Sequence, residues 1–370
     1  MAPLLGLKSL VFVILLGSLI FTNQAAGARV DMTKLEKQLH KRQAKTIHAS
    51  WGDTYDCVEF HKQPAFDHPL LKDHKIQMKE ELSSVSLPKT GKNQIDECPK
   101  GTVPIRRTTR EDLIASKLSV NYTGSQYRAG VTYNTKLGET IYGASGVMNV
   151  WNPQVNEDQF SSGEIALQSG SQPQEEATII KFGWTVNPQL YGEHVTRSFA
   201  YWTSDGGKTG CYNTVCPGFV QVHSKHTPDS AFPTTSEFEG TQILFTVQIT
   251  LDKEGGKWWL VGNGEAIGYW PRELFPAFAP GATSVFWGGR VMSGIDRLSP
   301  PMGSGKPLND YVLDDAGFML SIRYIDMNNN QNILPEATEP TIDCLEYYNV
   351  TYIPEHGNVY FGGTGGLNCI

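Results

Sequence analysis

Apolar and polar residues alternate along much of the chain from about residue 127 onward. Residues 245–251 read FTVQITL, in which every second side chain is apolar and the intervening ones are Thr, Gln and Thr. This period of two predicts a half-buried strand. Residues 252–257 then have the composition of a turn, and residues 258–270 (WWLVGNGEAIGYW) predict the returning strand of a hairpin.

Similar short runs recur through the rest of this region and are separated by Gly, Pro and Asn. Gly accounts for 37 of the 370 residues, which suits loops that join short strands, and no helical periodicity persists over a useful length. We therefore expect an all-β domain, an antiparallel β-sandwich, over residues 126–370.

The beginning of the chain has the pattern of a signal peptide. An apolar run at residues 10–21 follows a single basic residue, Lys8, and precedes the small residues AGA at 26–28. The run is too short to span a membrane. We therefore expect residues 1–28 to be removed and the mature chain to be secreted, extracellular or vacuolar, with no membrane association.

Residues 29–125 form a second region, which is rich in Lys, His and Glu. Pro64 and Pro69 exclude long helices and central strands from its middle part. We expect a small, irregular segment that is tied together by a disulfide. Residues 104–112 (PIRRTTRED) are basic, and we expect them to be exposed, with Arg106-Arg107 as a protease site.

The six cysteines are an even number, which favours three disulfides in an exported chain. Other connectivities remain possible, and no paired CxxC pattern supports a zinc site. Proximity in the sequence favours Cys57–Cys98, Cys211–Cys216 and Cys344–Cys369.

Other features limit the partners of the chain. We expect a structural or solvated role for His61, His68 and His74, and we predict neither a metal nor a cofactor. Sequons at Asn121 and Asn349 predict N-glycosylation. The net charge of −7 argues against a nucleic-acid partner, which usually requires a basic surface.

A series of ordered motifs resembles the plant neprosin family. In the N-terminal region they are YDCVEFHKQPAFDHPLLKDHKIQ (55–77) and CPKGTVPIRR (98–107). In the β region they are residues 177–206, 209–221, 256–260, 267–271, 285–291 and 301–305. The resemblance runs from about residue 46 to the C-terminus. It implies an activation peptide followed by a β-sandwich glutamic endopeptidase that cleaves after proline in acid.

The resemblance places the two catalytic glutamates of the family on Lys181 and Arg290. The family has Ile-Glu-Ala-Gly-Trp and Trp-Gly-Gly-Glu, where this chain has IKFGW and WGGR. Alternation places Lys181 and Gly183, and likewise Gly288 and Arg290, on the strand face opposite the apolar residues. We expect the glycines to leave the backbone open to a ligand. We also expect these four residues to line a ligand cleft that carries positive charge where the family has acids.

Acid peptide hydrolysis requires two carboxyl groups that share a site, one ionised and the other protonated. Arginine cannot take either role, because it does not lose its proton near neutral pH. We therefore predict a catalytically inactive relative that binds an extended peptide or an anionic cell-wall polymer. Its oligomeric state stays open. As an alternative, each cation reaches solvent or pairs with a nearby carboxylate.

A further alternative is an active acid endopeptidase that uses other carboxylates. The first candidates are Glu164 and Glu273, which lie in motifs that flank the family's cleft. No serine nucleophile elbow or HExxH motif is present. Without a carboxyl pair the chain would not cut itself, so residues 29–125 are expected to stay attached unless another protease acts. The remaining candidate acids are Glu175, Glu176, Asp205 and Glu265.

Overall fold

The computed structural model describes residues 43–78, 96–109, 112, 124–169, 177–208, 210–308 and 315–369. The expected signal peptide lies outside these residues, and so do Asn121, Glu175 and Glu176. Within the described residues, no helix has the length and apolar character needed to cross a membrane.

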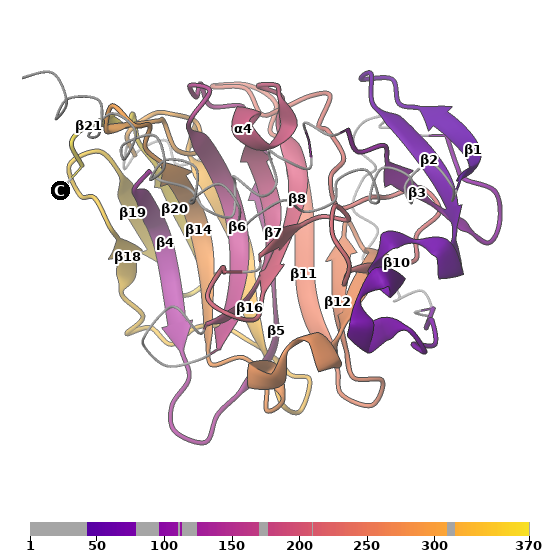
Figure 1. Ribbon diagram of the computed structural model, residues 1–370. Helices are drawn as coiled ribbons and strands as arrows, with labels where there is room; N and C mark the ends of the chain where they lie inside the picture. Colours follow the sequence, from indigo (N-terminus) through magenta and orange to yellow (C-terminus); the bar gives the residue numbers. More distant parts are fainter. Residues whose placement is uncertain are drawn as a thin grey trace, which may run out of the picture. The chain divides into compact units, whose positions relative to one another are not determined.

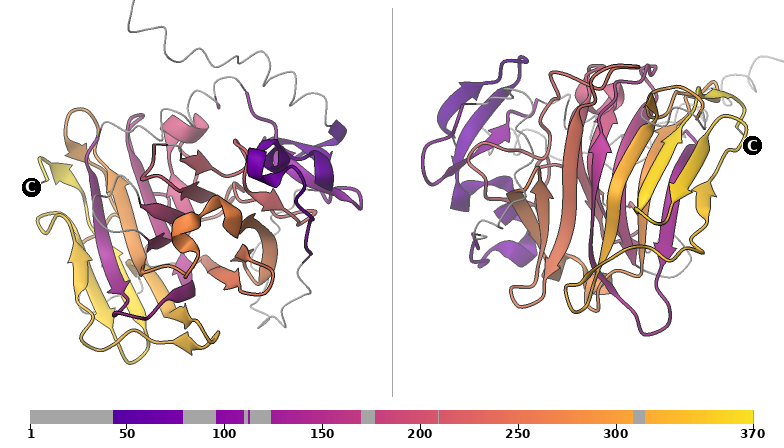
Figure 2. Two further views of the ribbon diagram at one scale, coloured as in Figure 1. Left: turned by 60° about the horizontal axis from the view of Figure 1, so that its bottom comes forward. Right: turned by 180° about the vertical axis from the view of Figure 1, so that it is seen from behind.

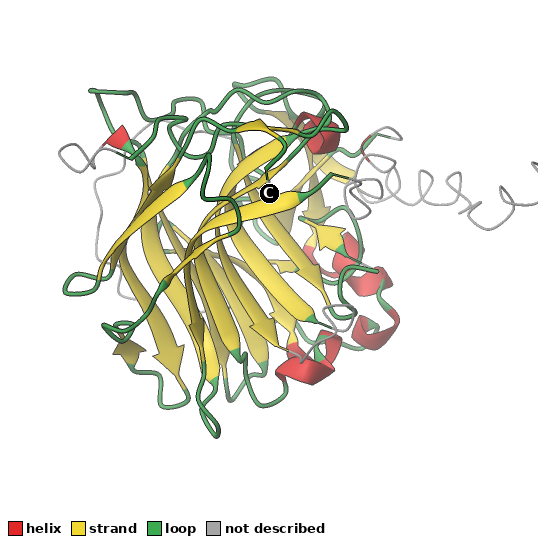
Figure 3. Cartoon of the chain, turned by 90° about the vertical axis from the view of Figure 1, so that its left-hand side faces the viewer, coloured by secondary structure: helices red, strands yellow, loops and turns green. Residues whose placement is uncertain are grey.

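Most of the described chain forms two large antiparallel sheets that pack face to face (Figure 1, Figure 3). The seven-stranded sheet has the order β18-β4-β14-β6-β7-β8-β9. Its strands are β4 (Gln126–Asn134), β6 (Phe160–Ser169), β7 (Thr178–Val186), β8 (Arg197–Thr203), β9 (Cys211–Tyr212), β14 (Ser284–Met292) and β18 (Pro340–Ile342). The all-β, antiparallel architecture that alternation predicted is confirmed.

The nine-stranded sheet has the order β10-β13-β12-β11-β5-β16-β20-β19, and β17 pairs with β16 (Figure 2). Its strands are β5 (Ile141–Asn149), β10 (Val220–Gln221), β11 (Leu244–Asp252), β12 (Lys257–Gly262), β13 (Glu265–Pro271), β16 (Gly317–Asp326), β17 (Gln331–Asn332), β19 (Asn349–Ile353) and β20 (Asn358–Gly362). The shorter elements of this region are α4 (Pro188–Tyr191), η5 (Arg272–Leu274), η6 (Pro276–Phe278), β15 (Leu298–Ser299) and β21 (Gly366–Leu367).

The hairpin predicted from residue 245 onward contains one strand more than expected. Strand β11 follows the alternation, but residues 258–270 divide into two strands, β12 and β13, instead of forming one. The turn between them has Asn263 and Gly264 at φ values of 50° and 81°. Two successive positive φ values are what a type I′ hairpin turn requires, and Asn-Gly is its preferred sequence.

The apolar residues of β7 and β14 point into the space between the two sheets, where they are buried in one core cluster. They are Ile180, Phe182, Trp184, Val285, Trp287 and Val291. Two of the indoles also join the sheets through hydrogen bonds to β5. Trp184 Nε1 donates to the carbonyl oxygen of Asn149 over 2.8 Å, and Trp287 Nε1 donates to that of Ser145 over 3.1 Å. The opposite faces of β7 and β14 are therefore left for polar residues.

The N-terminal segment is more regular than expected. It contains a three-stranded antiparallel sheet of β1 (Gln43–His48), β2 (Thr54–Glu59) and β3 (Thr102–Arg106). Pro64 and Pro69 begin two of the short 3-10 helices that follow β2, where a missing N–H is tolerated. These helices are η1 (Phe60–Lys62), η2 (Pro64–Asp67) and η3 (Pro69–Leu71).

Three disulfides constrain the chain, and they join the cysteines that sequence proximity favours. They are Cys57–Cys98, Cys211–Cys216 and Cys344–Cys369. The first joins β2 to the residues that precede β3, so it closes the N-terminal sheet covalently.

Of the basic pair Arg106-Arg107, Arg107 is exposed as expected but Arg106 is not, and cleavage at this pair stays a prediction. Arg106 ends β3, its side chain is 13% exposed, and its guanidinium lies 2.9 Å from Asp112 and 3.6 Å from Asp229. Arg107 is more exposed and forms an ion pair with Asp56. Proteases cut accessible, extended segments, so a cut at Arg106 would require β3 to open first.

Buried polar contacts fix the N-terminal segment to the β domain. Gln63 Nε2 donates to the carbonyl oxygen of Gln221 on β10, and the Gln221 N–H donates to Gln63 Oε1. Arg197 of β8 is 2% exposed and donates to Asp53 over 2.6 Å. A buried charge without a partner is costly. The Asp53–Arg197 pair therefore resists separation of the segment from β8.

The two glycines expected to open the cleft allow close approach of strands. Gly288 has a φ of 154°, which other residues rarely adopt, and a Cβ there would collide with the carbonyl oxygen of Ala129 on β4. A Cβ at Gly183 would collide with the carbonyl oxygen of Gly163 on β6. Strand packing, rather than backbone access for a ligand, explains both glycines.

We predict that Gly288→Ala lowers the free energy of unfolding by roughly 2–4 kcal/mol, because the new methyl group forces β14 away from β4. The matched control is Gly146→Ala on β5, where the nearest atom to a Cβ would be 3.3 Å away. Chemical denaturation of both variants measures the difference. Equal losses would contradict the packing role of Gly288.

Candidate functional site

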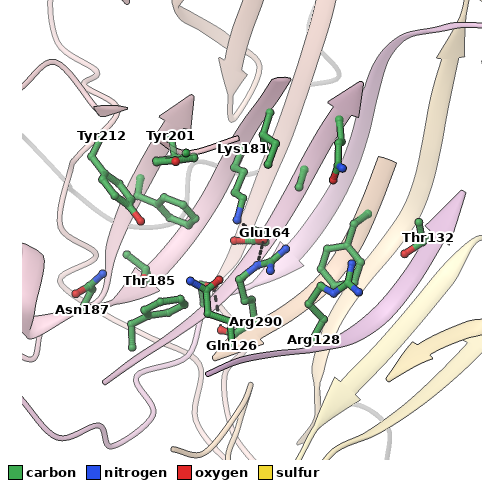
Figure 4. A pocket seen from close by; sticks show the side chains of 18 of the residues that line it. Gln126, Arg128, Thr132, Glu164, Lys181, Thr185, Asn187, Tyr201, Tyr212 and Arg290 are labelled. Atoms are coloured by element: carbon green, nitrogen blue, oxygen red, sulfur yellow. Dashed lines mark hydrogen bonds and ion pairs between the residues drawn. The ribbon is translucent and has the colours of Figure 1, made fainter. Parts of the chain in front are cut away.

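A cleft lies on the face of the seven-stranded sheet that points away from the core. Its cavity has a volume of about 480 Å³, and side chains from β4, β6, β7, β8, β9 and β14 line it (Figure 4). Lys181 and Arg290 are among the lining residues, whereas Gly183 and Gly288 are not. The alternation of β7 and β14 produces this arrangement, since residues next to the inward-pointing tryptophans face the cleft.

Glu164 of β6 lies at the centre of the cleft between Lys181 and Arg290. Its Oε1 atom is 2.6 Å from Nε of Arg290 and 3.3 Å from Nζ of Lys181 (Figure 4). Gly183 and Gly288 occupy the positions directly opposite Glu164 on the two neighbouring strands. Because neither carries a side chain, Lys181, two residues before Gly183, and Arg290, two residues after Gly288, reach Glu164 diagonally.

The three charges of this cluster alter one another's protonation. Burial alone would raise the pKa of Glu164, but the charges and hydrogen bonds of Arg290 and Lys181 outweigh it and lower the pKa below its ordinary value. Burial lowers the pKa of Lys181 to about 8, and repulsion from Arg290 adds to this effect despite the attraction of Glu164. The neighbouring cations therefore favour the ionised form of Glu164, whereas a glutamic peptidase needs a proton on one of its two acids.

A third cation, Arg128 of β4, lies directly opposite Arg290 in the strand register. Its Nε and Nη2 atoms donate to the two carboxylate oxygens of Asp343 over 2.9 and 3.2 Å. The guanidinium groups of Arg128 and Arg290 both lie near the Phe286 ring, at 5.9 and 5.8 Å from its centroid. The cleft lining thus carries three cations, with Lys181, against two carboxylates, which leaves one net positive charge.

The other candidate acids do not join Glu164. Glu273 is exposed on η5 and does not line the cavity. Glu265 is exposed, and Asp205 accepts a hydrogen bond from the Thr203 hydroxyl. Among the described residues, the second carboxylate of the cleft is Asp343, which Arg128 occupies through two hydrogen bonds. In the described cleft, therefore, no two carboxyl groups are paired so that they could share a proton.

Sequence reasoning identified Lys181, Arg290 and Glu164 but missed that they form one cluster. Alternation in FSSGEIALQ does place Glu164 on the face opposite Ile165 and Leu167, so the sequence does predict that Glu164 points away from the core. Its two partners depend on the register of β6 with β14 and β7, which no single strand reveals. Arg128 and Asp343 were not singled out from the sequence at all.

Other predicted sites lie away from this cleft. Asn349 is exposed at the start of β19, so its sequon is accessible, and glycosylation there stays a prediction. His74 Nε2 lies 2.9 Å from the Tyr269 hydroxyl group. In the part of the chain that the structure describes, no group of three or more His, Cys, Asp or Glu side chains is arranged to hold a metal ion.

The fold and the site define a two-sheet, antiparallel β protein with a charged cleft on one sheet and an N-terminal segment attached. The family model for neprosin matches residues 157–364, and the model for the neprosin activation peptide matches residues 46–145. The chain therefore belongs to the neprosin family. The second match extends into β5, beyond the boundary at residue 125/126 that the sequence predicts, and that boundary stays a prediction.

Solved structures share a weaker similarity with the chain. The Ruminococcus gnavus IT-sialidase CBM40 bound to alpha2,6 sialyllactose is 14% identical and has a TM-score of 0.24; the match covers 46% of this chain and 88% of that one. A leech intramolecular trans-sialidase in complex with 2,7-anhydro-Neu5Ac is 10% identical with a TM-score of 0.22, over 45% of this chain and 26% of that one. Both similarities span less than half of this chain.

We predict that Glu164→Gln lowers the free energy of unfolding at pH 7 by about 3 kcal/mol, because it leaves two poorly solvated cations without their shared partner. The control is Glu273→Gln, an exposed site where the change should stay within about 0.5 kcal/mol. Urea denaturation of the two variants gives both values. A loss at Glu164 no larger than that at Glu273 would refute the central role of this carboxylate.

A second prediction concerns the pH dependence of stability. Between the folded pKa of Lys181, about 8, and its ordinary value of 10.5, the unfolded chain binds a proton that the folded chain does not. Stability contributed by this group therefore rises with pH in that window. The groups that set the shift are Glu164, Arg290 and Arg128 on the neighbouring strands.

From pH 7 to pH 9.5 the wild-type chain should gain about 2 kcal/mol of stability relative to Lys181→Met. Denaturation midpoints at a series of pH values provide the test. The matched control is Lys136→Met, at an exposed lysine outside the cavity. A flat difference for Lys181→Met would show that this amine titrates normally.

Proposed function

We propose that the chain is a secreted neprosin-family protein that has lost glutamic-peptidase chemistry and binds an extended polymer in the retained cleft. The export part of this proposal rests on the N-terminal apolar run, on the even number of cysteines and on the three disulfides. The functional part rests on the cleft itself.

One observation carries the loss of activity: Oε1 of Glu164 binds both cations that stand where the family has its catalytic glutamates. An acid peptidase needs one carboxylate that activates water and a second carboxyl group that donates a proton. Glu164 has no such partner in the described cleft, and its Oε1 atom is already engaged by both cations. Arg290 cannot exchange a proton in the physiological range.

Lysine chemistry does not replace the missing acid. A lysine with a lowered pKa can serve as a base for a neighbouring nucleophile. In the described part of the chain, however, no serine, threonine or cysteine is hydrogen-bonded to Lys181, whose bonding partner is Glu164. Lys181 also lies near the Tyr201 ring, with Nζ 5.7 Å from the centroid.

Retention of the cleft supports a binding role. A cavity of about 480 Å³ has the size of a ligand site, and its lining mixes aromatic rings with hydroxyl and amide groups. The net positive charge of its lining favours an anionic ligand. The sheet beneath the cleft packs its other face into the core, which supports the cleft floor from below.

The competing function is an active acid endopeptidase that uses Glu164 or Glu273. The two cations that favour the ionised form of Glu164, and the exposed position of Glu273, both weigh against it. The two functions give opposite results in a peptidase assay.

We predict that the purified chain does not hydrolyse a quenched, proline-containing peptide at any pH from 2 to 8, and that Glu164→Gln is equally inactive. A triple variant, Lys181→Glu, Arg290→Glu and Glu164→Gln, restores a carboxyl pair on either side of a neutral residue. We expect it to hydrolyse the peptide in acid, on the order of 100-fold above the wild type. Hydrolysis by the wild type that Glu164→Gln or Glu273→Gln abolishes would overturn the proposed function.

A further inference from the structure

The guanidinium group of Arg290 is only partly engaged. Its Nε atom donates to Glu164, but neither terminal nitrogen donates a hydrogen bond to any residue that the structure describes. The side chain is 16% exposed, lines the cavity, and keeps contact with solvent there. Two parallel N–H groups of an arginine match the two oxygens of a carboxylate, so the free edge of Arg290 is a carboxylate-binding group.

The surroundings of Arg290 strengthen this preference. Arg128 stands opposite it on β4, and like charges at opposed positions of neighbouring strands repel each other. Asp343 neutralises Arg128, and Glu164 has one negative charge for both Arg290 and Lys181. The cluster of Arg290, Lys181 and Glu164 therefore lacks one negative charge, which a bound carboxylate would supply.

The sheet beneath the cleft also restricts the kind of polymer. Strands β14, β6 and β7 are paired on both sides, so their backbone N–H and C=O groups are used within the sheet. An extended peptide usually gains affinity by adding a strand to a free sheet edge, and this floor has none. Recognition must come from side chains instead.

The side chains of the cleft suit a hydroxyl-rich ligand. Hydroxyl groups of Thr132, Thr185 and Ser284 and the amides of Gln126 and Gln168 line the cavity. Such groups pair with sugar hydroxyls, which both donate and accept hydrogen bonds. The Tyr201 and Tyr212 rings, 4.8 Å apart between centroids, add an amphipathic surface against which the apolar face of a sugar ring can pack.

We propose that the cleft binds a uronic-acid polysaccharide and that one of its carboxylates docks bidentately on the terminal nitrogens of Arg290. This inference rests on the proposed function, in which the cleft binds a polymer without cutting it. Lys181 and Arg128 flank the docked carboxylate, and the hydroxyl and amide side chains contact the sugar rings.

The test is calorimetric titration of the full chain with an oligogalacturonate of about ten sugars, with the same oligomer after methyl esterification, and with poly-glutamate. We expect the oligogalacturonate to bind, and methyl esterification to weaken binding at least tenfold, because it removes the carboxylates but keeps the sugar rings. Since this comparison uses the unaltered chain, it does not depend on the folding of any variant.

Variants then locate the carboxylate. Arg290→Gln should weaken binding at least tenfold, and Arg290→Lys about threefold to fivefold, because lysine keeps the charge but loses the bidentate geometry. The control is Arg272→Gln, at an exposed arginine outside the cavity, which should bind like the wild type. Equal weakening by Arg272→Gln, or none by Arg290→Gln, would place the ligand elsewhere and overturn the proposal.

The remaining outcomes separate this inference from the proposed function. Equal binding of the esterified oligomer, or binding of poly-glutamate in preference to the oligogalacturonate, overturns the choice of ligand. Absence of oligogalacturonate binding by a chain that also fails to hydrolyse peptides overturns this inference alone. Hydrolysis of the proline-containing peptide by the same preparation overturns the proposed function.

Discussion

The charge balance at Glu164 sets the properties of the whole cleft. The carboxylate stands on the middle strand of three, and the strands on either side each bring a cation to the same oxygen atom. Without it, Lys181 and Arg290 would repel each other in a place where water screens them poorly. An acid peptidase has two carboxyl groups that share a proton, whereas this site has one carboxylate between two cationic side chains.

The geometry that allows this balance comes from the sandwich beneath it. Tryptophans and aliphatic residues of β7 and β14 fill the space between the sheets, and alternation then presents the intervening residues to the cleft. The glycines opposite Glu164 have two effects at once. They let the strands approach closely, and they leave the positions beside the carboxylate free of side chains, so the two long cations can reach it.

The sequence predicted the features that a single segment encodes. Alternation identified β11 and the two faces of β7 and β14, and proximity favoured the disulfides that the structure forms. The prediction from the sequence was wrong where a turn interrupts an apolar segment. Asn263-Gly264 was taken for part of a continuous strand, but these residues form the turn between β12 and β13.

The sequence also failed where distant residues meet. Arg128 and Asp343 are 215 residues apart in the sequence and form an ion pair. Arg106 likewise forms an ion pair with Asp229, which comes from a distant part of the sequence. Such contacts depend on strand register and on the docking of separate elements, which no local pattern contains. The pairing of Glu164 with both Lys181 and Arg290 also depends on strand register, and for that reason it could not be predicted from any one segment.

The position of the N-terminal segment has a consequence for access to the cleft. Its described residues contact β8, β10 and β13, and none of residues 43–78 and 96–109 lines the cavity. A polymer can therefore reach Glu164 and its cations while these residues stay in place. In this molecule the described part of the N-terminal segment is packed against the β domain as a structural subdomain, and its contacts there leave the cleft lining to other residues.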